Sequence, residues 1–213
     1  MKKIVSYSLW GDDEKYTIGA IKNAQLRKEF YPDWIARFYV GESVPNDIVT
    51  SLREVENTDV VLMNESGDWT GMFWRFLAAD GDDIVVSRDT DSRPSWREVH
   101  AVDEWLNSDK DFHIMRDHPY HGTAILGGMW GARNGILKGL TQSVSDYHKG
   151  NFWQVDQNFL RDIVYPIVKD RAMVHDEFFE KKPFPTPRLP REFVGQPFNA
   201  DDTECDTRHG DMI

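Results

Sequence analysis

Apolar segments of strand length alternate along this chain with segments whose apolar residues have helical spacing. The strand candidates cover residues 4–10, 34–40, 60–63, 84–87 and 112–115, and the helical patterns cover residues 16–30, 48–55, 72–79 and 95–106. The last helix is predicted to begin with a capping box, Ser95 to Glu98. Such alternation favours parallel strands joined by right-handed helical crossovers. The sequence therefore predicts an α/β fold.

Two carboxylates follow the apolar run at residues 84–86, which has the β-branched composition of a strand buried on both faces. Asp89 and Asp91 are one residue apart, so they lie on the same face of an extended chain. Ligands of open α/β sheets bind at the carboxyl ends of strands, and carboxylate oxygens suit a divalent cation. The pair is therefore a candidate metal site, although a solvated turn is the commoner setting of a lone Asp-X-Asp motif.

The composition is that of one folded domain with an acidic balance. Of 213 residues, 40% are hydrophobic, and 36 Asp and Glu oppose 25 Lys and Arg, for a formal net charge of −11. That balance argues against a protein that binds nucleic acid by neutralising phosphates, and a phosphorylated substrate would then need a metal. Cys205 is the single cysteine, and the sequence contains no recognisable signal peptide or apolar run of about 18 residues. We expect a soluble cytoplasmic protein with no nucleic-acid partner and no membrane insertion.

The character of the chain changes after Glu180. Residues 181–197 contain five prolines, and residues 201–206 are acidic. We therefore expect a folded domain over residues 1–180 and a Pro-rich, acidic tail or linker over residues 181–213. A linker to further domains of a longer polypeptide and a plain disordered terminus both fit this composition.

Common nucleotide-binding motifs are missing, because the sequence has neither Gly-X-Gly-X-X-Gly after the first strand nor a P-loop. Phosphatases of the haloacid dehalogenase type also place Asp-X-Asp after an apolar strand, but they expect Thr or Val where this chain has Arg93. A metal-dependent phosphatase or nucleotidyltransferase with the same Asp pair remains an alternative. A second alternative is a non-catalytic sugar-binding module, in which tryptophans such as Trp69, Trp74, Trp130 and Trp153 stack on sugar rings.

The order of these features resembles glycosyltransferases of the GT-A fold. A Trp-containing helix with Arg75 precedes the apolar strand, then follow Asp89-Thr90-Asp91, a Gly-rich segment and an Asp-Gln pair. Residues 67–76, 117–122 and 127–131 are similar to the glycosyltransferase domains with which chloroviruses build their capsid glycan, and the likeness covers about residues 1–180. The resemblance implies a Rossmann-like, mostly parallel central sheet flanked by helices. It also implies transfer of a sugar from a UDP-sugar to a hydroxyl of a glycan acceptor, in the host cytoplasm if the protein is viral.

The resemblance assigns the metal and nucleotide sites residue by residue. Asp89 and Asp91 match the pair that holds Mn²⁺ or Mg²⁺ against the diphosphate, and His175 matches a third metal ligand, a role for which His118 and His121 compete. The nucleotide is expected to contact the first strand, Arg75 and the strand that carries the carboxylates; the residues concerned are Ser6, Tyr7, Ser8, Leu9, Trp10, Arg75, Asp89 and Thr90.

The sugar site is expected further along the chain. Asp156 and Gln157 match the element that borders the reacting carbon of the donor sugar, although a polar start to the following helix would look the same. Gly127 and Gly128 would let the backbone approach the sugar closely, and a tight turn would need them equally. His118 and Trp130 complete the expected donor and acceptor contacts.

The stereochemical expectation is retention of configuration. No carboxylate is clearly placed as a nucleophile, which favours front-side attack in which the leaving phosphate takes the acceptor proton. Inversion would need a general base, for which Asp117, Asp156 and Asp176 are candidates. For the chlorovirus enzymes the resemblance implies L-rhamnose as the transferred sugar, but no residue of this chain separates rhamnose from glucose or galactose.

Overall fold

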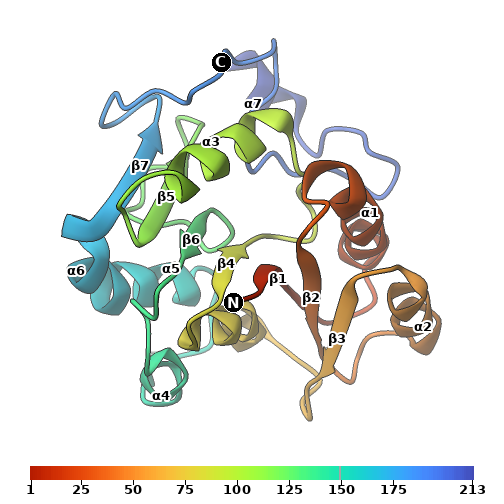
Figure 1. Cartoon of the computed structure of the whole chain (residues 1–213). Helices are drawn as coiled ribbons and strands as arrows, with labels where there is room; N and C mark the ends of the chain where they lie inside the picture. Colours follow the sequence, from red (N-terminus) through yellow and green to blue (C-terminus); the bar gives the residue numbers. More distant parts are fainter. Residues whose placement is uncertain (149) are drawn as a thin grey trace.

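A seven-stranded sheet lies at the centre of the computed structural model, which describes residues 1–148 and 150–213 (Figure 1). The strand order is β3-β2-β1-β4-β6-β5-β7; β6 runs antiparallel to β4 and β5, and the other neighbours are parallel. The predicted α/β class and mostly parallel sheet are confirmed. The strands are β1 (Lys3–Leu9), β2 (Ile35–Val40), β3 (Thr58–Leu62), β4 (Ile84–Ser87), β5 (Phe112–Arg116), β6 (Trp130–Ala132) and β7 (Ala172–Asp176).

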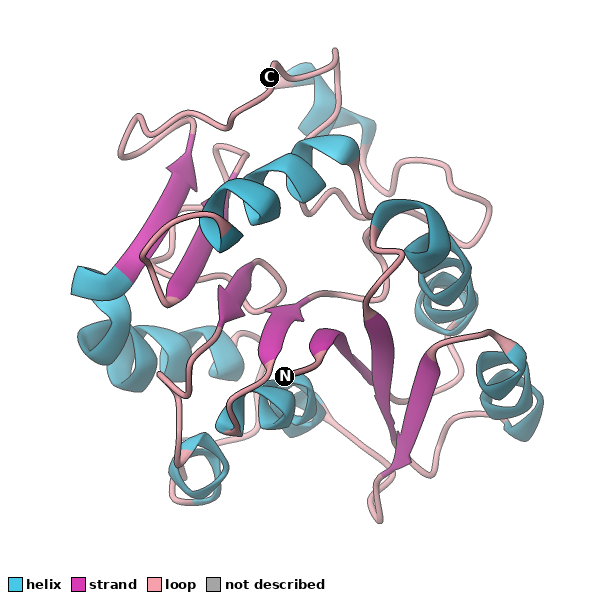
Figure 2. Cartoon of the chain, viewed as in Figure 1, coloured by secondary structure: helices cyan, strands magenta, loops and turns pink. Residues whose placement is uncertain are grey.

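Helices surround the sheet on both faces (Figure 2). The α-helices are α1 (Glu14–Phe30), α2 (Asn46–Glu54), α3 (Trp96–Leu106), α4 (Leu140–Ser145), α5 (Val155–Phe159), α6 (Tyr165–Val168) and α7 (Thr207–Asp211). The segment predicted as a helix at residues 72–79 is a 3₁₀ helix, η1 (Trp69–Asp80). A π-helical turn, η2 (Leu160–Val164), joins α5 to α6, and a short 3₁₀ helix, η3 (Lys169–Arg171), precedes β7.

The capping box predicted at the start of α3 forms only in part. The Ser95 side chain accepts a hydrogen bond from the backbone N–H of Glu98, as expected of an N-cap. The Glu98 carboxylate, however, is fully buried and does not return to the cap: it accepts a hydrogen bond from Tyr31 Oη at 2.8 Å and pairs with Arg88 at 3.0 Å. Arg88 follows β4 directly, so this buried pair ties α3 to the loop that carries Asp89 and Asp91.

Alternation along the strands divides the core into two layers. In β1, Val5, Tyr7 and Leu9 pack with the apolar residues of α1, α2 and α3, whereas Ile4 packs with those of η1 and α5 on the opposite face. Polar Ser6 and Ser8 share the second face and are satisfied by η1: Ser6 Oγ donates to the carbonyl of Arg75, and Ser8 Oγ accepts from its N–H. These bonds fix Arg75 over the sheet.

Residues 181–213 lie against the domain where the sequence predicted a tail. Phe184, Phe193 and Val194 are buried in this segment. The N–H of Val194 donates to Asp117 Oδ2 at 2.9 Å, and the N–H of Phe198 donates to the carbonyl of Asp91 at 2.7 Å. The end of the chain therefore contacts the carboxyl ends of β4 and β5.

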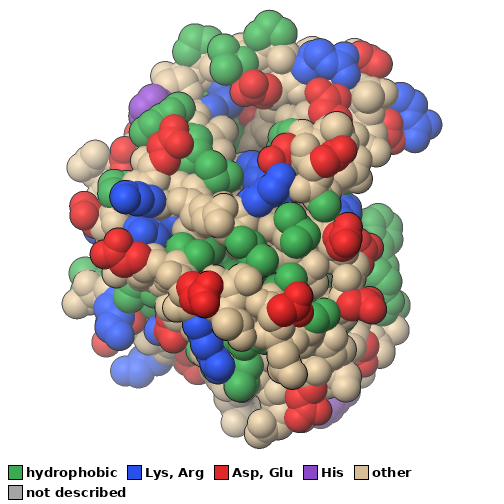
Figure 3. Space-filling model, turned by 90° about the vertical axis from the view of Figure 1, so that its right-hand side faces the viewer, with side chains coloured by type: hydrophobic (Ala, Val, Ile, Leu, Met, Phe, Trp, Pro, Cys, Tyr) green, Lys and Arg blue, Asp and Glu red, His purple; other side chains and the backbone are tan. Residues whose placement is uncertain are grey.

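Acidic and basic side chains intersperse on the face that Figure 3 shows, and hydrophobic side chains gather near its centre and along its upper edge. Within the described part of the chain, no helix has the length and apolar character needed to cross a bilayer.

Candidate functional site

A cavity of about 460 Å³ opens at the carboxyl ends of β1 and β4. This is the edge of the sheet where the sequence predicted a ligand. The lining residues come from the ends of these strands, from α1, η1 and α5, and from the loops at residues 121–129 and 195–197; they are Ser8, Leu9, Trp10, Gly11, Asp12, Asp13, Tyr16, Trp69, Met72, Arg75, Asp89, Thr90, Asp91, His121, Leu126, Gly127, Met129, Trp153, Gln154, Asp156, Gln157, Gly195 and Pro197.

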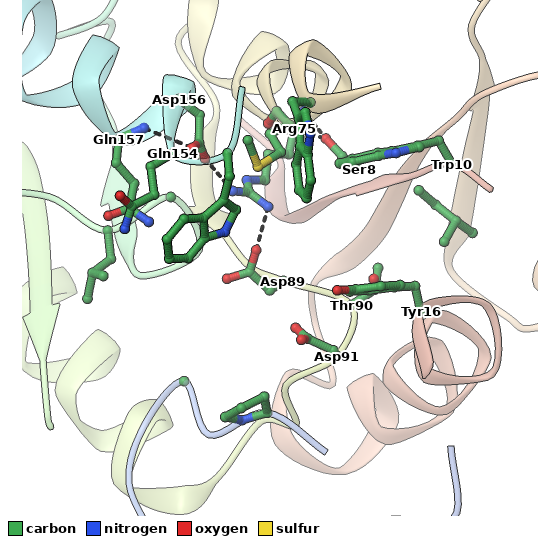
Figure 4. A pocket seen from close by; sticks show the side chains of 18 of the residues that line it. Ser8, Trp10, Tyr16, Arg75, Asp89, Thr90, Asp91, Gln154, Asp156 and Gln157 are labelled. Carbon is green, nitrogen blue, oxygen red and sulfur yellow. Dashed lines mark hydrogen bonds and ion pairs between the residues drawn. The ribbon is translucent and has the colours of Figure 1, made fainter. Parts of the chain in front are cut away.

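Asp89 and Asp91 both reach this cavity (Figure 4), and each is already paired with a cation. Asp89 Oδ1 lies 2.5 Å from Arg75 Nη1, and Asp91 Oδ2 lies 2.8 Å from Lys15 Nζ in the first turn of α1. The Asp89 side chain is 46% exposed and that of Asp91 is 16% exposed. Burial raises the pKa of Asp91, the nearby charge of Asp89 acts in the same direction, and Lys15 opposes both.

The two carboxylates fit a divalent cation. Each ion pair engages one carboxylate oxygen, so the second oxygen of each side chain lies outside its pair. A cation there would also relieve the mutual repulsion that raises the pKa of Asp91. Among residues 1–148 and 150–213, no three His, Cys, Asp or Glu side chains converge on one point, so a cation would take its remaining ligands from phosphate oxygens or water.

Arg75 joins the Asp pair to Asp156. Its Nη1 contacts Asp89, and its Nη2 lies 2.8 Å from Asp156 Oδ2, with both Arg75 and Asp156 buried (Figure 4). Asp156 Oδ1 also accepts a hydrogen bond from the N–H of Gln157 at 2.8 Å. Burial raises the pKa of Asp156, whereas Arg75 opposes the shift. The arrangement links η1, the loop after β4 and the start of α5 through one guanidinium.

Gly127 and Gly128 pack against these carboxylates. A Cβ at position 127 would overlap Arg75 and Asp156, and a Cβ at position 128 would overlap Asp89. Both carbonyls are anchored, that of Gly127 by Ser87 Oγ at 2.8 Å and that of Gly128 by Arg88 Nη1 at 2.9 Å. The groups that approach these two glycines closely are thus the side chains of Arg75, Asp89 and Asp156, and the approach to a sugar stays a prediction.

Aromatic side chains form the outer wall of the cavity. Trp153 is 65% exposed and Trp69 is 46% exposed, so folding leaves much of both indoles open to solvent. Gln154 follows Trp153 with a φ of 70°, a left-handed conformation that non-glycine residues seldom adopt and that often occurs at binding sites. The loop is held to η1 by Asn151 Nδ2, which donates to Asp68 Oδ2 at 2.6 Å.

Ten of the residues expected from the sequence line this cavity. They are Ser8, Leu9, Trp10, Arg75, Asp89, Thr90, Asp91, Gly127, Asp156 and Gln157, and Gly128 lies behind Asp89. Ser6 and Tyr7 do not reach it: Ser6 is bonded to η1, and Tyr7 stacks on Phe38 in the core at 4.7 Å between ring centroids. Ser6 is turned to η1, and Tyr7 points to the other face of β1.

Two residues expected to contact sugars are placed elsewhere. Trp130 is fully buried in β6, where it stacks on Phe112 at 5.5 Å between ring centroids, so it is a core residue. His118 is buried beside the C-terminal segment: its Nδ1 accepts from the N–H of Tyr120, and its Nε2 lies 3.1 Å from the carbonyl of His209. Neither side chain lines the cavity.

His175 also lies apart from the Asp pair. β6 and β5 separate β7 from β4, which at a strand spacing of about 4.8 Å places β7 roughly 14 Å away. His175 Nδ1 is 2.7 Å from His113 Nε2, and its Nε2 is 3.3 Å from Glu104 Oε2. The expectation of a third metal ligand at this position is therefore not met. The histidine that reaches the cavity is His121, whose pKa is lowered to about 3 by burial.

Several lining residues escaped the sequence reasoning. Asp12, Asp13 and Tyr16 line the cavity at the start of α1, close to the Asp91 partner Lys15, and no motif marks them. Gly195 and Pro197 come from the segment that was expected to be a tail. The apolar pair Phe193 and Val194 was the available signal that this segment packs.

Comparisons with known proteins identify the fold. No protein-family model matches the chain, and no curated protein matches its sequence. A glycosyltransferase involved in the glycosylation of the major capsid of PBCV-1 matches with a TM-score of 0.53 and 14% identity, over 84% of each chain. Glucosyl-3-phosphoglycerate synthase from Mycobacterium tuberculosis, in complex with UDP, matches with a TM-score of 0.54 and 16% identity, over 88% of this chain and 72% of that one.

Two further solved structures share the fold. The same mycobacterial synthase in complex with Mn²⁺, UDP-glucose and phosphoglyceric acid matches with a TM-score of 0.53, over 81% of this chain and 68% of that one. A proposed glucose-1-phosphate thymidylyltransferase from Bacillus anthracis matches with a TM-score of 0.51 and 12% identity, over 83% of this chain and 87% of that one. Identities this low establish the fold and leave the activity to the site. The chain therefore has the GT-A-like α/β fold expected from the sequence.

Proposed function

We propose that this chain is a metal-dependent glycosyltransferase of the hexosyltransferase type, which moves a sugar from a UDP-sugar to a hydroxyl of a glycan acceptor. The observation that carries the proposal is the meeting of Asp89, Asp91, Arg75 and Asp156 in one cavity at the carboxyl ends of β1 and β4. Mn²⁺ or Mg²⁺ held by Asp89 and Asp91 would place positive charge beside the departing UDP. A fold neighbour solved with Mn²⁺ and UDP-glucose supports this assignment.

The cavity offers two walls for the two halves of the donor. Ser8, Leu9 and Trp10 at the end of β1 form the wall proposed for uridine, and Asp156 and Gln157 form the opposite wall, proposed for the sugar (Figure 4). Asp89 and Asp91 lie between these walls, where a diphosphate would bridge them. The open aromatic face of Trp153 at the rim would receive the acceptor, because the faces of sugar rings stack on indoles.

The ion pairs and hydrogen bonds that the candidate carboxylates already make favour retention of configuration. Asp156, which is part of the wall proposed for the sugar, has one oxygen on Arg75 and the other on the N–H of Gln157, which makes it a poor nucleophile. Asp117 is paired with Arg97 and Arg188, and Asp176 with Arg116, so neither is available as the general base that inversion needs. Front-side attack, with a leaving phosphate oxygen taking the acceptor proton, uses none of them.

Calorimetric titration with UDP, with and without Mn²⁺, tests the proposal. Wild-type protein should bind UDP in the presence of Mn²⁺, and the Asp89→Asn, Asp91→Asn double variant should lose this binding. Asp109→Asn, which changes an exposed carboxylate outside the cavity, is the matched control and should bind as wild type does. Metal-dependent binding would justify a screen of UDP-sugars, with L-rhamnose, glucose and galactose as donors. Failure of the wild-type protein to bind UDP with Mn²⁺ would refute the nucleotide-sugar assignment.

A nucleotidyltransferase is the second candidate, because a proposed thymidylyltransferase shares the fold. Such an enzyme releases pyrophosphate from a nucleoside triphosphate and a sugar phosphate. Asp12 and Asp13, which line the cavity just after β1, would repel the additional phosphate of a triphosphate. Pyrophosphate release from sugar 1-phosphates and triphosphates, measured beside UDP-sugar turnover, separates the two activities. A sugar-binding module would show neither activity and no metal-dependent UDP binding.

A further inference from the structure

His121 is the cavity residue whose chemistry the proposed function leaves unassigned. It lies in the loop after β5, and it lines the same cavity as Asp89 and Asp91. We infer that His121 is a hydrogen-bond donor to a phosphate oxygen of the nucleotide diphosphate, through Nε2–H, and is not a metal ligand. The inference rests on the proposed function, since it names the group that this side chain would contact.

The hydrogen bond at the other ring nitrogen decides the tautomer. The backbone N–H of Asp117 donates to His121 Nδ1 at 3.0 Å, so Nδ1 presents its lone pair to the backbone. A neutral imidazole carries one N–H, which must then be on Nε2. A nitrogen that carries a proton has no lone pair for a cation, because metal ligation uses the unprotonated nitrogen of a neutral ring. The same nitrogen is well suited to donate to an oxygen.

The backbone N–H of Asp117, which donates to His121 Nδ1, is held in a fixed position. The Asp117 carboxylate is fully buried and pairs with Arg97 Nε at 2.9 Å and with Arg188 Nη2 at 2.5 Å. It also accepts from the N–H of Val194 at 2.9 Å. These bonds fix the backbone at residue 117, and with it the direction of the N–H that selects the tautomer. A proton on Nδ1 would leave this N–H facing another N–H.

The surroundings of the ring favour an anionic oxygen as its partner. Phe193 and His118 pack beside it, each with a centroid separation of 5.7 Å, so the two rings limit the positions that it can take. The cations of the site, Arg75 and Lys15, are each engaged by a carboxylate. A diphosphate near Asp89 and Asp91 brings several acceptor oxygens, and bonds from N–H groups to phosphate are stronger than bonds between neutral groups. Burial keeps the ring neutral, so it donates a hydrogen bond without acting as a general acid.

Two substitutions separate donation from metal ligation. His121→Gln places an amide N–H close to the position of Nε2, and His121→Ala removes the donor. We expect the Kd for UDP in saturating Mn²⁺ to rise about 10- to 100-fold in His121→Ala, the range for loss of a bond to a charged group, and to return to within about 3-fold of wild type in His121→Gln. The affinity for Mn²⁺ alone, measured by electron paramagnetic resonance without nucleotide, should be unchanged in both variants.

This test has its own control variant, and the results that would overturn the inference differ from those that would refute the proposed function. His100→Ala changes an exposed histidine on α3 and should leave both affinities unchanged, and thermal unfolding of each variant reports whether it folds. A weakened affinity for Mn²⁺ in the His121 variants, or a long-range ¹H–¹⁵N spectrum of the wild-type protein with the proton on Nδ1, would overturn the inference while UDP binding stands. UDP binding that is unaffected in His121→Ala would also overturn it. Wild-type protein that does not bind UDP would refute the proposed function itself, and the phosphate partner with it.

Discussion

Gly128→Ala is expected to damage the site by moving Asp89. A Cβ built on Gly128 lies 2.8 Å from the backbone N of Asp89 and overlaps the Asp89 carboxylate. Neither segment can retreat easily, because the carbonyl of Gly128 accepts from Arg88 Nη1 and the carbonyl of Gly127 accepts from Ser87 Oγ. The strain must therefore fall on Asp89 and on its pair with Arg75.

The size of the effect follows from these distances. Unstrained carbon contacts begin at about 3.5 Å, so the Asp89 backbone must shift by roughly 0.7 Å and the carboxylate by more. Metal sites hold their ligands to about 0.2 Å, and a misplacement of about 1 Å at a reacting centre costs on the order of 100-fold. We therefore expect Mn²⁺-dependent UDP affinity to fall about 100-fold, or about 2.8 kcal/mol, together with about 1–3 kcal/mol of folding stability from overpacking.

Calorimetry with UDP and Mn²⁺ measures the first effect, and urea unfolding measures the second. Gly81→Ala is the matched control, since a Cβ at Gly81 has no neighbour within 4 Å and its φ of −107° suits alanine. Gly81→Ala should leave both quantities at the wild-type values. A folded Gly128→Ala variant that binds UDP as tightly as wild type would refute the steric argument, because Asp89 would then tolerate a displacement that its role forbids.

Three further predictions concern the arginine bridge, the acceptor wall and pH. Arg75→Lys cannot span Asp89 and Asp156, since an ammonium lacks the planar fork, and UDP affinity in calorimetry should fall about 10-fold; equal affinity would contradict the bridging role. Trp153→Ala should raise the acceptor KM about 10-fold and leave UDP binding intact, whereas Trp96→Ala, on α3, should change neither. Burial lowers the pKa of His113 and of His175 below 6.5, so below that pH the unfolded chain binds more protons than the folded chain. The free energy of unfolding should therefore keep its full value above about pH 6.5 and decline on acidification to pH 5.5. In His113→Phe, the unfolding free energy measured with urea should decline less on acidification than in the wild-type protein. An equal decline would contradict the assignment of this pH dependence to the buried histidines.

Local patterns in the sequence were sufficient to predict most strands of the sheet. The β-branched run at residues 84–86 forms β4, and helical spacing at residues 48–55 marks α2, because burial of one face, which carries Ile48, Val49 and Leu52, imposes a period that the sequence displays. Asp89, Thr90 and Asp91 reach the cavity as predicted, since their positions depend only on where β4 ends. Arg75 and Asp156 also reach it, although the geometry that joins them to Asp89 was not foreseen.

The errors concern residues whose placement depends on distant parts of the chain. His175 lies near the end of an apolar strand and Asp89 lies just after one, but the insertion of β6 and β5 between the two strands separates them. Trp130 follows Gly127 and Gly128 closely, yet the parity of β6 turns its ring into the core. Residues 181–213 looked like a tail because prolines prevent regular structure, but prolines do not prevent packing, and Phe193 and Val194 dock on the domain.

The sequence by itself determined the α/β class, the strand that carries the Asp pair and the position of both carboxylates at its carboxyl end. Only the tertiary structure decided which groups surround them: Lys15 beside Asp91, Gly128 beside Asp89, and His121 in the same cavity. The physical reason is the range of the forces involved. Hydrophobic periodicity acts over neighbouring turns and strands and is legible along the chain, whereas the meeting of loops from different strands depends on strand order, which long-range packing selects.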